Sequence, residues 1–177
     1  MYLRERDVAG RHVAVITLVL SAIVLTACGG SDSESQSSGV GDEFAARATA
    51  VCDTALKSKQ AWSTFPVASF DPTHPDKTAL SEVAGWLEQE VTPTFDAWFQ
   101  GLQALGDPPS GQQAWSDVLA AVGTIDKLNA DQVSTAKAGD TAGFARATQG
   151  LHDIQSELER ATQAAGVASC ATVHASG

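Results

Sequence analysis

The cysteines are the residues of this chain whose chemistry the sequence defines best. Cys28 follows Leu25, Thr26 and Ala27 at the end of an apolar stretch. An aliphatic residue and two small residues before a cysteine are typical of a bacterial lipobox, where a signal peptidase cleaves before the cysteine and the thiol carries diacylglycerol. The sequence therefore predicts that Cys28 is lipidated, and that acyl chains such as palmitate hold the protein on a membrane surface.

The segment before Cys28 has the layout of a secretory signal. Arg4, Arg6 and Arg11 lie in a charged leader, and residues 13–24 are almost entirely apolar. A membrane-spanning helix needs about 20 apolar residues, whereas this run is shorter and no basic cluster follows it. We therefore expect residues 1–27 to be a lipoprotein signal peptide, which places the protein on the extracytoplasmic face of the cell membrane.

Cys52 and Cys170 form the second chemical feature. Three cysteines would leave one unpaired in an exported protein, but lipidation of Cys28 resolves the odd count. The other two then make one pair in an oxidising compartment. A redox or metal-binding pair is the alternative, and the sequence has no Cys-x-x-Cys spacing to support it. We predict a disulfide that encloses nearly the whole folded domain.

A metal site has weaker support in the sequence than lipidation or the disulfide. Asp71, His74 and Asp76 lie close together in a proline-rich segment and offer three possible ligands. A helix start with Thr73 and Asp76 as a capping box explains the same residues without a metal. Helical bundles hold di-metal centres through two Glu-x-x-His motifs, and the sequence has neither; His152 is expected on a partly solvated flank. We expect no metal and no cofactor.

No arrangement of residues in the sequence points to catalysis. There is no glycine-flanked serine that could form a nucleophile elbow and no glycine-rich loop that could hold a phosphate. The sequence therefore predicts no catalytic residues, and we expect the chain not to be an enzyme.

Aromatic side chains are the remaining candidates for contact with a ligand or a partner. Aromatic residues at helical spacing usually pack in the core, but such a set can also line an apolar pocket. Trp86 and Phe99 deviate from the apolar stripe of their segment, which favours a surface that faces a partner. The candidates are Trp86, Phe95, Trp98, Phe99 and Trp115.

The charge of the chain excludes one class of partner. The chain has 11 basic and 21 acidic residues; the first 27 residues hold three and two of these, which leaves a formal charge of −11 for the remainder. Nucleic acids need an electropositive surface. We therefore expect no nucleic-acid partner, and we expect membrane affinity to come from the lipid anchor.

The elements that position these residues are predicted to be helices. Residues 28–41 are rich in Gly and Ser and should form a flexible tether. Beyond them, apolar residues recur at helical spacing, which predicts a domain of 42–170 that is an antiparallel four-helix bundle. Residues 171–177 are expected to be a flexible tail. The predicted helices span 42–64, 73–105, 110–138 and 141–165.

Single residues refine this prediction. Pro93 should kink the second helix, although a break near Thr92 is the alternative. Asp42 and Ser110 are expected to cap the first and third helices, and either Asp140 or Thr141 the fourth. In such a bundle the end of the fourth helix lies beside the start of the first. The predicted disulfide joins those two places, so the pairing and the fold support each other.

Some of these segments resemble a known group of proteins. The run 44–52, the turn at Gly139 and Asp140, and the ending 164–170 are similar to small Ala-rich actinobacterial lipoproteins of uncharacterised function. The likeness covers most of residues 28–170, and the two domain cysteines carry most of it. It implies a helical domain with one disulfide in an actinobacterial envelope, and it supplies no catalytic residues.

Together these features favour a lipid-anchored binding or interaction module of the cell envelope, with an envelope protein as a possible partner. The alternative is a carrier or chaperone that holds an apolar ligand within the helical bundle. The discriminating property is the interior, because a carrier needs a cavity and a scaffold does not.

Overall fold

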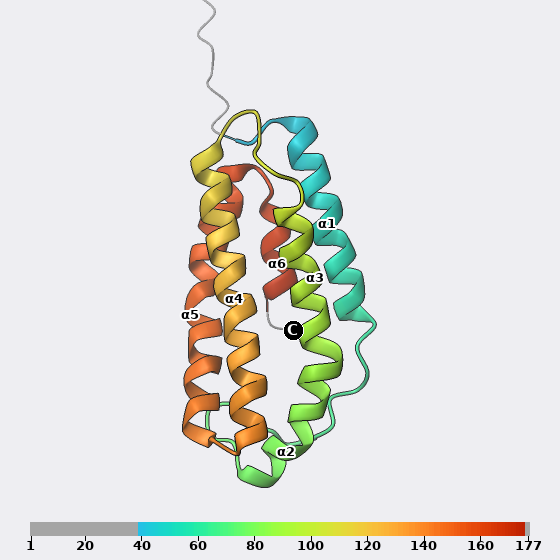
Figure 1. Ribbon diagram of the computed structural model, residues 1–177, viewed down its shortest axis with the longest axis vertical. Helices are drawn as coiled ribbons and strands as arrows, with labels where there is room; N and C mark the ends of the chain where they lie inside the picture. Colours follow the sequence, from blue (N-terminus) through green and yellow to red (C-terminus); the bar gives the residue numbers. More distant parts are fainter. Residues whose placement is uncertain (1–38, 176–177) are drawn as a thin grey trace, which may run out of the picture. The chain divides into compact units, whose positions relative to one another are not determined.

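The computed structural model describes residues 39–175, and this range contains helices, turns and loops but no strand (Figure 1). Cys28, the expected signal peptide and residues 28–38 of the expected tether lie outside it. The described part is therefore all-helical, as the apolar periodicity predicted. The elements are α1 (Asp42–Gln60), α2 (Lys77–Trp86), the π-helical turn η1 (Leu87–Val91), α3 (Thr92–Gln103), α4 (Gln112–Ala138), α5 (Thr141–Ala165), the 3-10 turn η2 (Ala168–Cys170) and α6 (Ala171–His174).

The helices meet through the apolar stripes that the sequence predicted. α4 and α5 pack along each other, α3 packs against both α1 and α4, and α6 contacts α1 and α5 (Figure 1). The interior is made of aliphatic and aromatic side chains from all of these helices. Burial of this apolar surface is the main favourable contribution to folding. The largest buried side chains are Trp98, Trp115, Phe44, Phe144, Leu80, Leu102, Ile125 and Leu158.

The segment around Pro93 stays helical by changing its pitch. Proline lacks an N–H and its ring crowds the carbonyl four residues earlier, so a regular α-helix cannot pass through it undisturbed. η1 takes one extra residue per turn just before the proline, and the Thr92 hydroxyl donates to the Leu87 carbonyl at 3.2 Å. A π turn of this kind is a known way to absorb such a disruption. Helical structure is thus continuous from Lys77 to Gln103.

The capping residues of the helices agree with the sequence at one position and differ at three. Asp140, one of the two caps predicted for the fourth helix, caps α5, and its carboxylate accepts from the Gly143 N–H at 2.9 Å. The second helix begins at Lys77 with Asp76 as its cap, not at Thr73. Glycines precede the other two: Gly41 before α1, which places Asp42 in the first turn, and the left-handed Gly111 before α4. Glycine adopts these positive φ angles without the steric cost that other residues incur.

The two ends of the expected domain are placed differently from the prediction. Val40, expected in the tether, is fully buried, and its N–H donates to the Ala165 carbonyl at 3.2 Å. Residues 171–174, expected in a flexible tail, form α6, in which Val173 is also fully buried. Both corrections have the same cause, because an isolated valine in a polar segment can still bury its side chain against a nearby core.

The first helix ends four residues earlier than predicted, at Gln60. The chain turns there so that Trp62 faces α3, where its Nε1–H donates to the Thr94 hydroxyl at 2.9 Å. This tertiary contact competes successfully with the local helix propensity of the segment. Within residues 39–175, no helix has the length and apolar character needed to cross a membrane.

Asp96 on α3 and Asp126 on α4 form a pair of acidic side chains between two helices. Partial burial, together with a hydrogen bond and repulsion from Asp96, raises the pKa of Asp126 to about 6. A carboxyl whose folded pKa is raised favours folding when protonated, so its ionisation destabilises the fold as the pH rises through 6.

We expect Asp126→Asn to stabilise the protein at pH 8 and to change little at pH 4. Solvent screening limits the gain to about 0.5–1 kcal/mol. Thermal unfolding at both pH values measures the effect, with Asp117→Asn, an exposed carboxylate on the same helix, as the control. An equal gain at pH 4 and pH 8 would contradict the assigned pKa.

Candidate functional site

The described residues enclose a pocket of about 600 Å³ beside the C-terminal end of α6. The short helix α6, drawn in dark red in Figure 1, packs against α1 and α5 and ends at His174. His174 lines the pocket together with residues from α1, η1, α3, α4 and α5. The pocket therefore forms where the four residues of α6 stop filling the space between the longer helices. Its volume is in the range that holds small organic ligands.

One wall of the pocket is aromatic and aliphatic. The rings of Trp62 and Trp86 meet edge to face with centroids 5.4 Å apart, and Phe95 lies 6.3 Å from Trp62. Hydrogen bonds fix both indoles, because Trp62 donates to Thr94 and Trp86 Nε1 donates to the Ser63 carbonyl at 3.2 Å. Leucine and valine side chains of η1 continue this wall. The surface is preorganised for an apolar group, since its rings need no rearrangement.

The part of the lining that α4 and α5 supply carries amide and hydroxyl groups. Asn129 and Gln132 lie on α4, and Gln132 Nε2 donates to the Thr148 hydroxyl of α5 at 2.9 Å. Asn129 is only 5% exposed, and its Nδ2 has no hydrogen-bond partner within residues 39–175. An unsatisfied buried donor costs about 1–3 kcal/mol.

The titratable groups of the pocket are one lysine and two histidines. Lys59 Nζ donates to the carbonyls of Val173 and Ala175 at 3.2 and 2.7 Å, and burial lowers the pKa of this amine. His174 Nε2 donates to the Leu151 carbonyl at 2.7 Å, and burial lowers the pKa of its imidazole. A lowered pKa keeps His174 neutral at pH 7. His152 is exposed at the rim.

Exposed residues mark the opening of the pocket. Thr73 belongs to the loop between α1 and α2, and Gln149 and His152 belong to α5; all three line the pocket and are exposed. The pocket is therefore open to solvent between this loop and α5. A ligand can enter there without separation of the core helices.

The structure divides the aromatic candidates among different environments. Trp86 and Phe95 line the pocket. Trp98 and Trp115 are core residues, 1% and 2% exposed, although Trp98 also borders a second pocket of about 390 Å³ between α1 and α3. Phe99 packs over Gly123 of α4, where an added Cβ would meet its ring at 3.0 Å. Trp86 and Phe99 are both partly exposed, and contact of either side chain with a partner stays a prediction.

Several pocket residues were not singled out from the sequence, among them Asn129 and Gln132. A signal for two of them was present. Asn129 and Gln132 follow Ile125 at helical spacing, so two amides interrupt an otherwise apolar stripe of α4. Buried amides in such a stripe need hydrogen-bond partners, which makes them candidates for a polar site.

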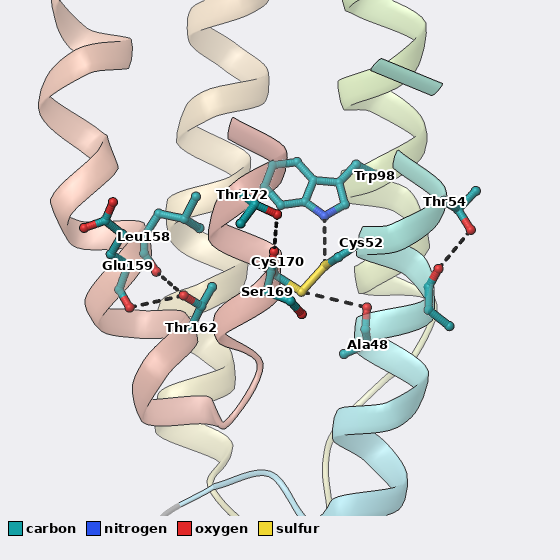
Figure 2. The surroundings of a disulfide bond; sticks show 11 residues. Ala48, Cys52, Thr54, Trp98, Leu158, Glu159, Thr162, Ser169, Cys170 and Thr172 are labelled. Atoms are coloured by element: carbon teal, nitrogen blue, oxygen red, sulfur yellow. Dashed lines mark hydrogen bonds between the residues drawn. A yellow bond between two sulfur atoms is a disulfide. The ribbon is translucent and has the colours of Figure 1, made fainter. Parts of the chain in front are cut away.

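The predicted disulfide is present. Cys52 of α1 and Cys170 of η2 are bonded with a Cα–Cα distance of 5.1 Å, and both are buried. Figure 2 shows the Trp98 Nε1–H donating to the Cys52 sulfur at 3.3 Å, while the Cys170 sulfur lies 3.9 Å from the Ala48 carbonyl oxygen. The bond joins α1 to the chain directly before α6, so it positions the element that ends at the pocket.

The polar side chains of residues 71–76 form hydrogen bonds within their own loop and at the start of α2. Asp71 accepts from the hydroxyl and the N–H of Thr73 at 2.6 and 2.8 Å, and these bonds lower the pKa of its carboxyl to about 2. Asp76 accepts from the Ala79 N–H at the start of α2. Within residues 39–175, no group of three His, Cys, Asp or Glu side chains is placed to hold a metal ion. The sequence motif is thus accounted for by turn and cap hydrogen bonds.

Comparison of the chain with protein-family models, curated proteins and solved structures gave no match. The pocket and its chemistry are therefore the basis on which a function is argued.

Proposed function

We propose that this protein is a lipid-anchored, extracytoplasmic binding protein of the bacterial envelope that carries a small amphipathic molecule in the pocket beside α6. The observation that carries the proposal is a pocket of about 600 Å³ whose lining combines aromatic rings with a buried amide that has no partner within residues 39–175. A mostly apolar pocket with a few convergent polar groups is the usual form of a small-molecule site. Anchoring through Cys28 rests on the lipobox alone.

The proposed architecture is the antiparallel four-helix bundle, with α2, η1 and α3 together acting as its second helix. The packing of α4 on α5, of α3 on α4 and of α1 on α3 supports this topology. A bundle of four helices provides a ligand site wherever the space between them is not filled by side chains. Here α6 fills one part of that space and leaves the other part open.

The residues that line the pocket also favour a ligand-binding role over a catalytic one. Among the described residues that line the pocket there is no serine, cysteine, aspartate or glutamate. Its polar groups are amides, threonine hydroxyls, a lysine bonded to two carbonyls and two histidines, of which His174 is bonded to a carbonyl. These groups orient a ligand through hydrogen bonds and offer no activated nucleophile.

A fluorescent probe tests the proposal. Phenylnaphthylamine, a neutral compound that fluoresces in apolar sites, is titrated into the full chain carrying Cys28→Ala, so that no attached acyl chain competes. We expect saturable binding that Thr148→Phe weakens at least about tenfold, because the larger side chain enters the pocket. Thr124→Phe, at an exposed position of α4, is the matched control and should bind like the parent.

Equal binding by the two phenylalanine variants would place the probe elsewhere and would contradict the proposal. Absence of saturable binding by the parent chain would also count against it, and would favour a role for the exterior in contacts with an envelope protein.

A further inference from the structure

The titratable groups that line the pocket are basic, in contrast to the chain as a whole. The chain has 21 acidic and 11 basic residues. Among the described residues that line the pocket, however, the titratable ones are Lys59, His152 and His174, and none is acidic. The pocket is therefore a local basic region within an acidic protein. Such a region attracts anions and disfavours cations.

The amine of Lys59 supplies the positive charge of the pocket lining. Its amine is half-buried and contacts two backbone carbonyls, which use two of its three N–H groups. The ion pairs formed within residues 39–175 join other residues, so no carboxylate of this range pairs with the amine. Removing a cation from water without an opposite charge costs free energy. An anionic group that enters the pocket would recover part of that cost.

Asn129 adds an independent reason for an acceptor-rich ligand. Its Nδ2 is buried and lacks an acceptor within the described residues, although the side chain lines the pocket. A carboxylate only accepts hydrogen bonds, and two oxygens let it serve more than one donor. An acceptor-rich head group is therefore the ligand chemistry that matches both pocket residues, Lys59 and Asn129.

We propose that the pocket selects an organic anion, a molecule with one carboxylate-like head group and an apolar body that lies against Trp62, Trp86 and Phe95. This inference rests on the proposed function and specifies the ligand class of the same site. Fatty acids and aromatic acids share this chemistry. The neutral or cationic counterparts of such molecules should bind more weakly, because they leave Lys59 without an opposite charge.

Two probes that differ chiefly by one charge test the inference. Anilinonaphthalene sulfonate is an anion, and phenylnaphthylamine is its neutral counterpart. Both are titrated into the full chain carrying Cys28→Ala at low and at high salt. We expect the anion to bind at least about tenfold more tightly at low salt and to lose part of this advantage at high salt, because salt screens the attraction. The affinity of the neutral probe should not change with salt in the same way.

Variants of Lys59 test whether its amine is the group that attracts the anionic probe. Lys59→Met also removes the bonds to the carbonyls of Val173 and Ala175, so both probes should lose affinity, but the anionic probe should lose about tenfold more than the neutral probe. Lys57→Met, at an exposed position of the same helix, is the matched control for net charge. Lys59→Arg restores the charge and should recover affinity for the anion. His152→Gln, at the exposed rim, changes no core contact and should weaken only the anion if its ring approaches the head group.

The outcomes separate this inference from the proposed function. Equal affinity for the two probes, or equal loss in Lys59→Met and Lys57→Met, overturns the anion assignment while the pocket still binds. No saturable binding of either probe overturns both. Competition by dodecanoate and by naphthoate then distinguishes the sources, because a fatty-acid site prefers the first and an aromatic-acid site prefers the second.

Discussion

Replacement of both Cys52 and Cys170 by alanine is expected to lower the free energy of unfolding by about 5 kcal/mol. The two cysteines are separated by 118 positions, so the bond closes nearly the whole domain into one loop. Such a bond restricts the unfolded chain, and the effect grows slowly with the size of the loop. A loss of this size is a large fraction of the stability of an ordinary domain.

Urea unfolding of the parent and of the double variant measures this effect, and the parent in reducing buffer is a second comparison. The reduced parent and the double variant should agree, since both lack the same constraint. We expect the dependence of the unfolding free energy on urea to become steeper, because the unconstrained chain exposes more surface. A loss below about 1 kcal/mol would mean that the unfolded chain stays compact without the bond.

The bond also connects stability with the pocket. Cys170 directly precedes α6, and Lys59 of α1 binds the carbonyls of Val173 and Ala175 at the other end of that helix. A helix of four residues has little stability of its own. Its position therefore depends on these two attachments to α1, and through His174 the same attachments shape one side of the pocket.

The helical fold was predictable because its signals are local. Apolar residues at helical spacing identified the four helical segments, and Gly139 with Asp140 identified the turn between α4 and α5. With Cys28 assigned to the lipobox, the two remaining cysteines permitted one pairing, which the structure contains. These features depend on residues close in sequence or on a count, so they did not require knowledge of the packing.

The pocket was not predictable in the same way, because it depends on where the core is incomplete. α6 was expected to be a tail, so nothing indicated that a short helix would enter the interior and stop at His174. Trp62 was assigned to the stripe of a longer first helix, whereas it lies beyond the end of α1 and forms the pocket wall. Tertiary contacts decide both features, and spacing in one sequence does not contain them.

Phe95→Ala is the second change for which we expect a large effect, a loss of about 3–4 kcal/mol in the free energy of unfolding. Phe95 is 5% exposed and lies where the core meets the pocket. Its ring is 5.9 Å from Trp98 on the core side and 6.4 Å from His174 on the pocket side, measured between centroids. Truncation removes the contacts that hold these two rings, and the space left behind adds to the pocket.

Phe99→Ala is the matched control, since Phe99 is an aromatic residue of the same helix that is only half-buried and packs over Gly123 away from the pocket lining. We expect a smaller loss of about 1–2 kcal/mol there. Urea unfolding with and without phenylnaphthylamine then separates the two sites. A ligand that binds only the folded state stabilises it according to its concentration and affinity.

The probe should therefore restore more stability to Phe95→Ala than to Phe99→Ala, because only the first variant offers new apolar surface inside the pocket. The atoms that line an empty apolar cavity lack van der Waals contacts on that side. A ligand ring of similar size can restore those contacts. Equal effects of the probe on the two variants would mean that Phe95 is an ordinary core residue. A selective rescue would show that the stability of the core and the occupancy of the pocket are linked through this one ring.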